Sequence, residues 1–411
     1  MPPSSATPPP ASPPAPAARA RLHPDVLRLG LVSFLTDLSS EMIFSVFAVF
    51  FTSVAGASAA LLGLIEGLAD FSASALNYLA GWLSDRSGAR KRLALAGYGF
   101  STLAKLILLL SSSLTGLSLF RVIERLGKGF RGPPRDAWLS AIAQRASRGY
   151  AFGVHKALDK AGAVLGPLAA YALLTGLGES PASYRLLFWL AFLPALLAVL
   201  LLALLREQPG TPHPRENPSQ NWRALSPAFK RFLLPSGLFA LGYFSLGFLL
   251  LRAHQLGFGL AQTVLLYALF NTSCVASAPL LGRLGDRLGR ARVLMLGYGL
   301  YLLVNAGLLL AEARWQIVGL FALYGVFYAI DESQSKAFIA DLEPERRATA
   351  VGAYNFVCGA AYVAASLAAG ALWSLEPRLA FAWAVGFSLA ALLAFRLRPP
   401  VCDGAASAAR P

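Results

Sequence analysis

The fold is decided by the stretch Gly81-Trp-Leu-Ser-Asp85-Arg86-Ser-Gly88, because it returns 201 residues later as Gly282-Arg-Leu-Gly-Asp286-Arg287-Leu-Gly289. Each copy lies between two long apolar runs. Farther along, Gly97-Tyr98-Gly99 matches Gly297-Tyr298-Gly299, and residues 148–173 resemble residues 347–372 at nearly the same offset. Three matching segments in register predict that the chain consists of two related halves.

The composition indicates a membrane protein. Of 411 residues, 56% are hydrophobic and only 14% are charged, whereas soluble domains carry about 25% charged residues. Apolar stretches of about 20 residues recur, each long enough to cross a hydrocarbon core of about 30 Å. The predicted spans lie near residues 29–53, 59–83, 93–112, 115–138, 149–175, 184–205, 231–252, 258–282, 293–311, 314–338, 347–373 and 377–397. The sequence therefore predicts an all-α membrane protein of about twelve transmembrane helices in two pseudo-symmetric six-helix bundles.

Composition also predicts the domain boundaries. We expect a disordered cytosolic tail at 1–27, the N-terminal bundle at 28–206 and the C-terminal bundle at 229–398. The segment 207–228 between them is rich in proline and polar residues, which is typical of a linker. Residues 399–411 are predicted to form a second cytosolic tail.

The basic residues predict the orientation. A net charge of +15 would suggest nucleic acid as a partner in a soluble chain, but here Lys and Arg lie between apolar runs, which favours a lipid bilayer and no nucleic acid. By our count about 26 lie on the side of both termini and about 4 on the other, so both termini should be cytoplasmic. Ala, Gly, Pro and Arg richness is typical of a GC-rich bacterial genome and thus of an inner (plasma) membrane. We expect a monomer.

No sequence pattern indicates a cofactor. The three cysteines include no close pair, so neither a disulfide framework nor metal-ligand spacing is expected. A phosphate-binding loop of the Gly-x4-Gly-Lys-Ser/Thr type is absent from the sequence, so ATP should not drive the protein directly. A proton gradient is the expected energy source, and a metal site is not expected.

The repeated stretch resembles a signature of the major facilitator superfamily, and the resemblance covers about residues 28–398. The family pattern G-x-L-a-D-r-x-G-r-k is matched from Gly81 to Arg90, except that Ala89 replaces an Arg. The resemblance implies a cytoplasmic latch that stabilises one state of an alternating-access cycle. The latch would comprise Gly81, Asp85, Arg86, Gly88, Arg90, Asp286, Arg287 and Gly289. Alternatively, the basic residues only fix the topology.

Two further signatures carry the resemblance. In span four, R-x-x-Q-G-x-G is matched by its Arg and last Gly, but Glu124 and Arg125 replace Gln and Gly. In span five, Gly153, Gly162, Gly166 and Pro167 match the pattern G-x8-G-x3-G-P, although its closing glycine pair is missing. The third signature is usually tied to proton-coupled exporters, so the resemblance implies efflux by antiport.

Charged residues inside the spans should face a cavity or each other, because an ionised group facing lipid at the bilayer centre costs roughly 2.5–3.5 kcal/mol. Helical spacing places two acidic pairs on one face each, in spans one and two. The candidate residues for proton coupling and the solute cavity are Asp37, Glu41, Glu66, Asp70, Arg121, Glu124, Arg125, His155, Asp159, Lys160, Asp331 and Glu332. The alternative is that these groups form permanent ion pairs that hold the spans together.

Spacing and depth also predict particular neighbours. Glu41 and Asp70 should lie at one depth, where two facing acids could share a proton. Separations of three and four residues allow three pairs within helices. These are Arg121–Glu124, Glu124–Lys128 and Lys156–Asp159. The adjacent Asp331 and Glu332 are about 100° apart on a helix, so at most one should point into the cavity.

The remaining candidates are open to two interpretations. The glycines of span five allow close helix packing, and Pro167 removes an amide donor and should kink the helix. They are either a bending point or a site of tight packing. His155 either carries protons or bonds within a polar cluster. The second half should supply aromatic and amide surface to the solute, and Tyr98 and Tyr298 should be packing residues.

The leading hypothesis is a secondary transporter that moves a small organic solute by alternating access, with proton-coupled efflux. A second hypothesis is uptake or uniport of a small anionic solute held by Arg121, Arg125 and Lys128. A polytopic membrane enzyme and a non-transporting receptor are further alternatives. The sequence lacks the metal-binding and nucleophile motifs that an enzyme of this kind would show.

Overall fold

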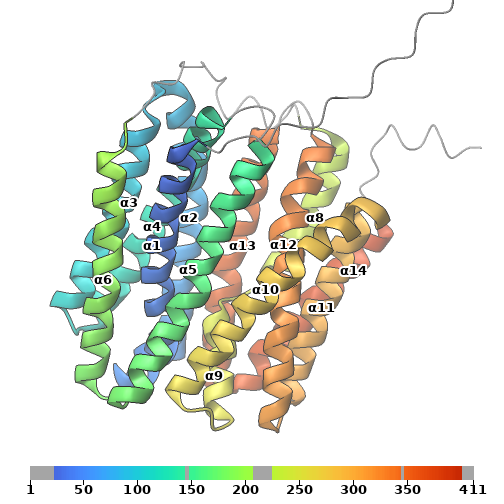
Figure 1. Cartoon of the computed structure of the whole chain (residues 1–411). Coiled ribbons are helices and arrows are strands. Elements are labelled where there is room, and N and C mark those ends of the chain that lie inside the picture. Colours follow the sequence, from blue (N-terminus) through green and yellow to red (C-terminus); the bar gives the residue numbers. More distant parts are fainter. Residues whose placement is uncertain (1–22, 144–147, 207–224, 344–346, 400–411) are drawn as a thin grey trace, which may run out of the picture.

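The computed structural model describes residues 23–143, 148–206, 225–343 and 347–399, and apart from helix ends and turns these segments are helical (Figure 1). The side chains of residues 85, 148–150, 286 and 347–349 are not described. In these segments the chain forms two bundles that stand side by side in Figure 1, one coloured blue to green and the other yellow to red. The predicted fold class is confirmed.

Within the described residues, each bundle contributes six membrane crossings. The first contains α1 (Pro24–Val49), the π-helical turn η1 (Phe50–Val54), α2 (Ala59–Ser87), α3 (Arg90–Leu110), α4 (Leu114–Ile142), α5 (Arg148–Leu177) and α6 (Pro181–Leu204). The second contains α8 (Pro227–Gly242), α9 (Leu246–Gln255), α10 (Leu260–Leu288), α11 (Arg290–Leu310), α12 (Arg314–Leu342), α13 (Arg347–Leu375) and α14 (Pro377–Leu397). We call the face at which α1 begins and α14 ends the terminal face, and the other the opposite face.

Local sequence explains where the helices begin and end. Serine caps the amino end of several helices, as at α2, where the Ser58 hydroxyl accepts a bond from the Leu61 amide. Gly88 ends α2 with φ of 66°, a left-handed conformation that favours glycine. α1 begins at Pro24, so the last four residues of the predicted disordered tail 1–27 are helical; proline at the first turn loses no helical hydrogen bond. α8 likewise begins within the predicted linker, at Pro227.

The seventh crossing differs from the continuous span predicted at 231–252. α8 ends at Gly242, and α9 starts at Leu246. The Ser245 hydroxyl caps α9 by accepting a bond of 3.2 Å from the amide of Gly247. A serine cap set between two glycines therefore divides the crossing into two helices.

The crossings α4 and α12 differ from the rest in hydropathy. Ten helical segments of the described chain are long and apolar enough to span a membrane, and these two are not among them. Both carry several charged residues in their middle turns. Charges are tolerated at membrane depth where they face protein or a cavity rather than lipid, so both helices should border the functional site.

The two bundles meet along two pairs of helices, α2 with α13 and α5 with α10. Near the opposite face, Gly63 of α2 lies so close to Gly370 and the Ser366 carbonyl of α13 that a side chain there would collide with them. The Glu179 carboxylate also accepts a bond of 2.8 Å from the amide of Ala261, which links the bundles at that face. The opposite face is therefore closed.

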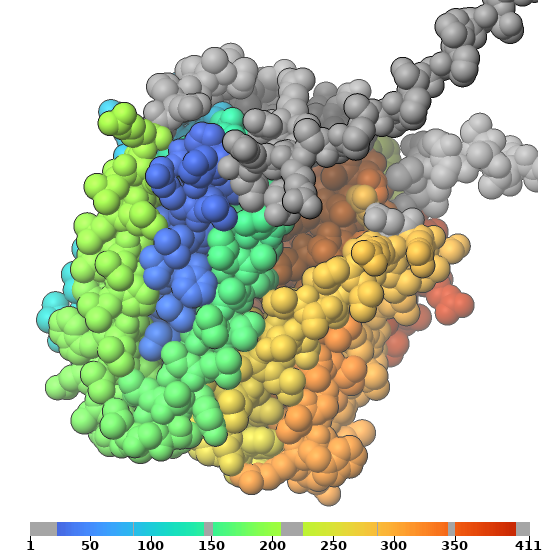
Figure 2. Space-filling model, viewed as in Figure 1, coloured from blue at the N-terminus to red at the C-terminus, as the bar shows by residue number. Residues whose placement is uncertain are grey.

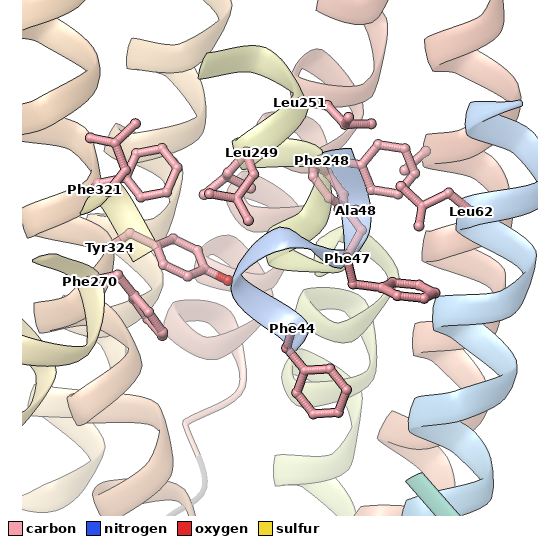
Figure 3. Close-up of a cluster of buried hydrophobic side chains, with 14 of the residues drawn as sticks. Phe44, Phe47, Ala48, Leu62, Phe248, Leu249, Leu251, Phe270, Phe321 and Tyr324 are labelled. Carbon is pink, nitrogen blue, oxygen red and sulfur yellow. The ribbon is translucent and has the colours of Figure 1, made fainter. Parts of the chain in front are cut away.

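Apolar side chains reinforce this closure. Figure 3 shows part of this buried apolar cluster, with Phe44 and Phe47 of α1 and Phe248 of α9. The Phe47 and Phe248 rings are buried, and the missing side chain of Gly247 lets α9 approach Ala48. We call the buried apolar residues Phe47, Ala48 and Phe248 the hydrophobic layer.

Candidate functional site

A cavity of about 730 Å³ lies between the bundles. Its lining reaches Asp136 on α4 and Lys336 on α12, close to the terminal face, and extends to Ala48 and Leu250 at the hydrophobic layer. Figure 2 shows a hollow between α5, in green, and α10, in yellow, toward the terminal face. The cavity is therefore accessible from the terminal face and closed at the opposite one.

An ion pair between Glu66 and Arg121 lies at the closed end. The Arg121 guanidinium donates Nε to Oε1 at 2.5 Å and Nη2 to Oε2 at 2.6 Å, a two-pronged contact that fixes both side chains. The Ser245 hydroxyl donates a third bond of 2.9 Å to Oε2 of Glu66 from the second bundle. The guanidinium also lies 4.2 Å from the centroid of the Phe44 ring. The break in the seventh crossing thus contacts the deepest ion pair of the first bundle.

Two more acidic candidates have arginine partners on α4. Nη2 of Arg125 lies 2.8 Å from Oδ1 of Asp70, and Nη2 of Arg131 lies 3.6 Å from Oδ1 of Asp37. The predicted pairs Arg121–Glu124 and Glu124–Lys128 do not form. Arginines on α4 face α1 and α2, so bonds between helices replace those expected within α4.

Glu41 differs from its neighbours on the cavity wall. Its carboxylate accepts a short hydrogen bond from the Tyr267 hydroxyl of α10, across the bundle interface. Among the described residues, no Lys or Arg nitrogen lies within 4.0 Å of it. Asp70 is bound by Arg125 in this structure, and proton sharing between Glu41 and Asp70 stays a prediction.

Further ion pairs link the bundles nearer the mouth of the cavity. Glu332 of α12 lies 3.1 Å from Nζ of Lys156 and 3.4 Å from Nζ of Lys160, both on α5. Lys156 also contacts Asp159 at 3.2 Å, as predicted. Asp331 accepts a bond from the Ser335 hydroxyl at 2.9 Å and lines the cavity together with Glu332. The expectation that only one of these adjacent acids would reach the cavity is wrong.

Two candidates lie outside the cavity. Glu124 is fully buried, with Oε1 bound by the Ser40 hydroxyl at 3.2 Å, and it is not among the lining residues. His155 bonds through Nε2 to the Ser33 hydroxyl at 2.9 Å, behind the wall. Both side chains point into the interior of the first bundle. The helix face on which they lie, rather than their depth in the membrane, therefore keeps them out of the cavity.

The second bundle lines the cavity with aromatic and amide side chains, which is the kind of surface that was predicted for it. These are Tyr243, Phe244, Tyr267, Phe270, Asn271, Tyr324, Tyr328, Asn355 and Tyr362. Tyr298 instead stacks on Phe239 with ring centroids 3.9 Å apart, and Tyr98 lies under the guanidinium of Arg131. Both tyrosines are packing residues in this structure. The first bundle thus lines the cavity mainly with ion pairs, and the second lines it mainly with aromatic rings.

The glycines of span five differ in their contacts. Gly162 and Gly166 lie directly against the backbone of α1, close to Phe34 and Leu38. A side chain at Gly153 would meet nothing within 4 Å, so the close approach expected there does not exist. α5 continues through Pro167 to Leu177.

The predicted latch is only partly described. The side chains of Asp85 and Asp286 lie outside the described part of the structure. The Arg86 guanidinium lies 5.1 Å from the centroid of the Trp82 ring. The latch therefore stays a prediction.

Among the residues of the site region that sequence reasoning missed are Lys105, Ser245 and Tyr267. Lys105 is a lysine inside a predicted span, which is by itself a signal for a functional site. Ser245 lies in a glycine-flanked interruption of an apolar run, a pattern that points to transporter binding sites. Tyr267 carried no such signal, because tyrosine is common in membrane helices and its contact with Glu41 spans 226 residues.

The Major Facilitator Superfamily profile matches residues 29–273 and 236–411. An uncharacterized MFS-type transporter of Methanocaldococcus jannaschii is 35% identical over 367 residues, covering 88% of this chain and 91% of that protein. An uncharacterized protein of Mycobacterium tuberculosis is 28% identical over 384 residues, covering 90% of this chain and 92% of that protein.

Solved structures share the fold at low sequence identity. A variant of the nucleoside transporter NupG superposes with a TM-score of 0.78 at 13% identity, covering 91% of this chain and 99% of that one. A bacterial homolog of the human lysosomal transporter Spinster, in its inward-facing and unoccupied conformation, gives 0.67 at 18% identity, covering 91% and 96%. The peptide transporter POT in complex with sulfate gives 0.71 at 15% identity, covering 92% and 96%.

Proposed function

This chain belongs to the major facilitator superfamily and is a membrane transporter rather than an enzyme, and from this premise we propose that it exports a small organic solute in exchange for protons. In this proposal the terminal face is cytoplasmic, because most Lys and Arg residues lie on that side. The cavity would then accept solute from the cytoplasm of a bacterial cell. Alternating access follows from rocking of the two bundles about the cavity.

The observation that carries proton coupling is the environment of Glu41. A coupling carboxylate must change its protonation state within the cycle, and a tight arginine partner opposes protonation because it stabilises the charged form. Glu66 and Asp70 have such partners, whereas the nitrogen of Arg131 lies farther from Asp37, at 3.6 Å. Glu41 is held by a tyrosine hydroxyl from the other bundle, so its bond must break when the bundles separate. Protonation of Glu41 would accompany that separation.

The charges on the cavity wall balance, which supports an organic solute that need not be a cation or an anion. Eight acidic and eight basic side chains line the cavity. Since most of them are paired with each other, the wall does not select strongly for a cation or an anion. The rings of the second bundle supply apolar surface for the body of the solute.

The experiment uses purified protein in liposomes that contain a pH-sensitive dye. An inward proton gradient is imposed, and candidate solutes are screened for proton movement and, as radiolabelled compounds, for flux. We expect Glu41→Gln to lose solute-evoked proton movement and still equilibrate radiolabelled solute. The control Asp25→Asn, on the same helix at the terminal face, should behave like the wild type. Solute flux that depends neither on the proton gradient nor on the Glu41→Gln substitution would contradict proton coupling.

One observation favours a second candidate, uniport or uptake of a small anion. Lys128 lines the cavity, and in the described part of the chain no carboxylate oxygen lies within 4.0 Å of its amine. An anionic group of the solute could therefore bind there. Under this proposal Lys128→Met would lower the affinity for anionic solutes and leave neutral ones unaffected, with no dependence on a proton gradient.

A further inference from the structure

Three polar residues lie inside the first bundle, behind the cavity wall. Nζ of Lys105 on α3 donates to the Ser40 hydroxyl of α1 at 3.3 Å, and that hydroxyl donates to Oε1 of Glu124 on α4 at 3.2 Å. Lys105 is 1% exposed, and Ser40 and Glu124 are fully buried. None of the three lines the cavity. We call them the buried triad.

The buried triad is not a direct ion pair. Among the described residues, no carboxylate oxygen lies within 4.0 Å of the Lys105 amine, and the serine hydroxyl separates the two charged groups. An ammonium has three donors, yet Lys105 has one hydrogen-bond partner here, and Oε2 of Glu124 has none. Buried charges are normally paired and fully bonded. The triad therefore keeps unused hydrogen-bonding capacity on both of its charged groups.

In the second bundle, the residues equivalent to the buried triad are uncharged. The repeat offset of 200 residues, seen between Gly97 and Gly297, places Asn305 at the position of Lys105 and Tyr324 at that of Glu124. α1 and α8 both begin at a proline, Pro24 and Pro227, and counting from these prolines places Tyr243 at the position of Ser40.

The contacts of these equivalent residues agree with that alignment. The Tyr243 and Tyr324 hydroxyls are 3.4 Å apart, so they repeat the contact between Ser40 and Glu124. Asn305, which is fully buried, donates to the Tyr301 carbonyl at 2.8 Å within its own helix. A bundle of this architecture thus packs with neutral groups at all three positions. The charges of the first bundle are not required by the fold.

We propose that the buried triad is a proton-binding site separate from the solute cavity, with Lys105 as the group that exchanges the proton. This inference rests on the proposed proton coupling. Lys105 gives a proton to Ser40 Oγ while that hydroxyl passes its own proton to Oε1 of Glu124, which leaves a neutral amine and a neutral carboxylic acid with no change in net charge. Glu124 then releases this proton to water once rocking of the bundles brings water to its carboxyl group, and Lys105 takes up another proton, which restores both charges.

The surroundings of Lys105 are consistent with proton exchange. In addition to Glu124, the charged groups that interact electrostatically with Lys105 are Lys128 and Arg131 of α4 and Asp37 of α1. α6 also packs against α3, but its titratable side chains, Tyr184 and Arg185, lie in its first turn at the opposite face. Lys105 is five residues from the end of α3, about 8 Å from the opposite face.

The first test needs no solute. The full-length protein, labelled with 15N in its lysines, is placed in lipid nanodiscs, and NMR distinguishes ammonium from neutral amine at each Nζ as the pH is varied. We expect one lysine signal that changes between the two forms while the protein stays folded and that is missing from Lys105→Arg. A Lys105 signal that keeps one form throughout would overturn the proposal, whether or not the protein transports anything.

The second test measures coupling in the dye-loaded liposomes. Removing one charge leaves the other buried and unpaired, which can prevent folding, so the main variant is Lys105→Asn with Glu124→Gln. We expect this variant to lose proton movement and retain exchange of radiolabelled solute. Lys105→Arg, which keeps the charge and cannot release a proton, should show the same loss. Retained proton movement in either variant would refute the triad as the coupling site.

The two tests also separate this inference from the proposed function. If the wild type moves solute and never protons, the proposed antiport has failed and the triad has no coupling role. If the wild type moves protons and the NMR shows a fixed Lys105, only the triad proposal has failed. In that case Glu41 alone would carry the coupling.

Discussion

The Ser245 hydroxyl of the second bundle donates a hydrogen bond of 2.9 Å to Oε2 of Glu66 in the first bundle. The same hydroxyl caps α9, so the start of that helix and the ion pair of Glu66 with Arg121 share one atom. Any motion that opens the opposite face must break this contact, because it lies at the closed end of the cavity. The broken seventh crossing is therefore part of the closure.

Ser245→Ala should destabilise the protein more than Ser226→Ala. Ser226 caps α8 through the Phe229 amide at 3.1 Å, so each change removes a cap worth about 1 kcal/mol. Ser245→Ala also removes a hydrogen bond to a carboxylate, worth about 1.5–3 kcal/mol. Thermal unfolding of the two variants in the same detergent measures the difference. Equal shifts in the unfolding midpoint would show that the contact with Glu66 contributes nothing.

Glu66→Gln and Arg121→Met should each be strongly destabilising, and the double variant much less so. Breaking a buried pair costs about 3–5 kcal/mol because the remaining charge is uncompensated. Both side chains are less than one tenth exposed. A double-mutant cycle on thermal stability checks this, and additive effects of the two single changes would contradict a coupled pair.

Glu332→Gln should weaken the contact between α5 and α12 with little loss of stability. Its partner Lys156 is about half exposed, and such pairs contribute roughly 1 kcal/mol or less. In Glu332→Gln we expect a wider distribution of distances between spin labels on α5 and α12. High salt screens the ion pair, so it should widen the distribution of the wild type toward that of the variant. Asp341→Asn, which removes a pair with Arg290 inside the second bundle, is the matched control and should leave the distances unchanged.

Gly162→Ala and Gly153→Ala should have opposite effects. A Cβ at Gly162 would collide with the Phe34 carbonyl and lie 2.9 Å from the Leu38 amide nitrogen, and overpacking of this kind costs about 1–3 kcal/mol. At Gly153 there is open space, so alanine should stabilise the helix by roughly 0.5–1 kcal/mol. Thermal unfolding of both variants tests this, and destabilisation by Gly153→Ala would contradict the contacts described here.

The fold was predictable from the sequence for physical reasons. A segment in lipid must satisfy its own backbone hydrogen bonds, so every long apolar run becomes a helix. The repeat around Asp85 and Asp286 then gives two equivalent bundles. The break at Ser245 was not predicted, because hydropathy measures only the average of a window and does not detect a local cap.

The site was predictable only as a group of residues. The cost of charge in lipid is enough to select the acids and bases of α1, α2, α4 and α5 as functional candidates. Spacing along one helix then predicted the wrong partners, since Arg121 reaches Glu66 on α2 and not Glu124 on its own helix.

The sequence by itself therefore determined the number of crossings, their pairing by repeat and which side chains must avoid lipid, since these follow from length, hydropathy and charge along the chain. Only the tertiary structure decided which helix face meets which neighbour. It placed Glu41 against Tyr267 across the interface, and Lys105 and Glu124 on either side of Ser40 away from the cavity. The reason is that hydrogen bonds and ion pairs act over a few ångströms between residues that are tens to hundreds of positions apart in the chain.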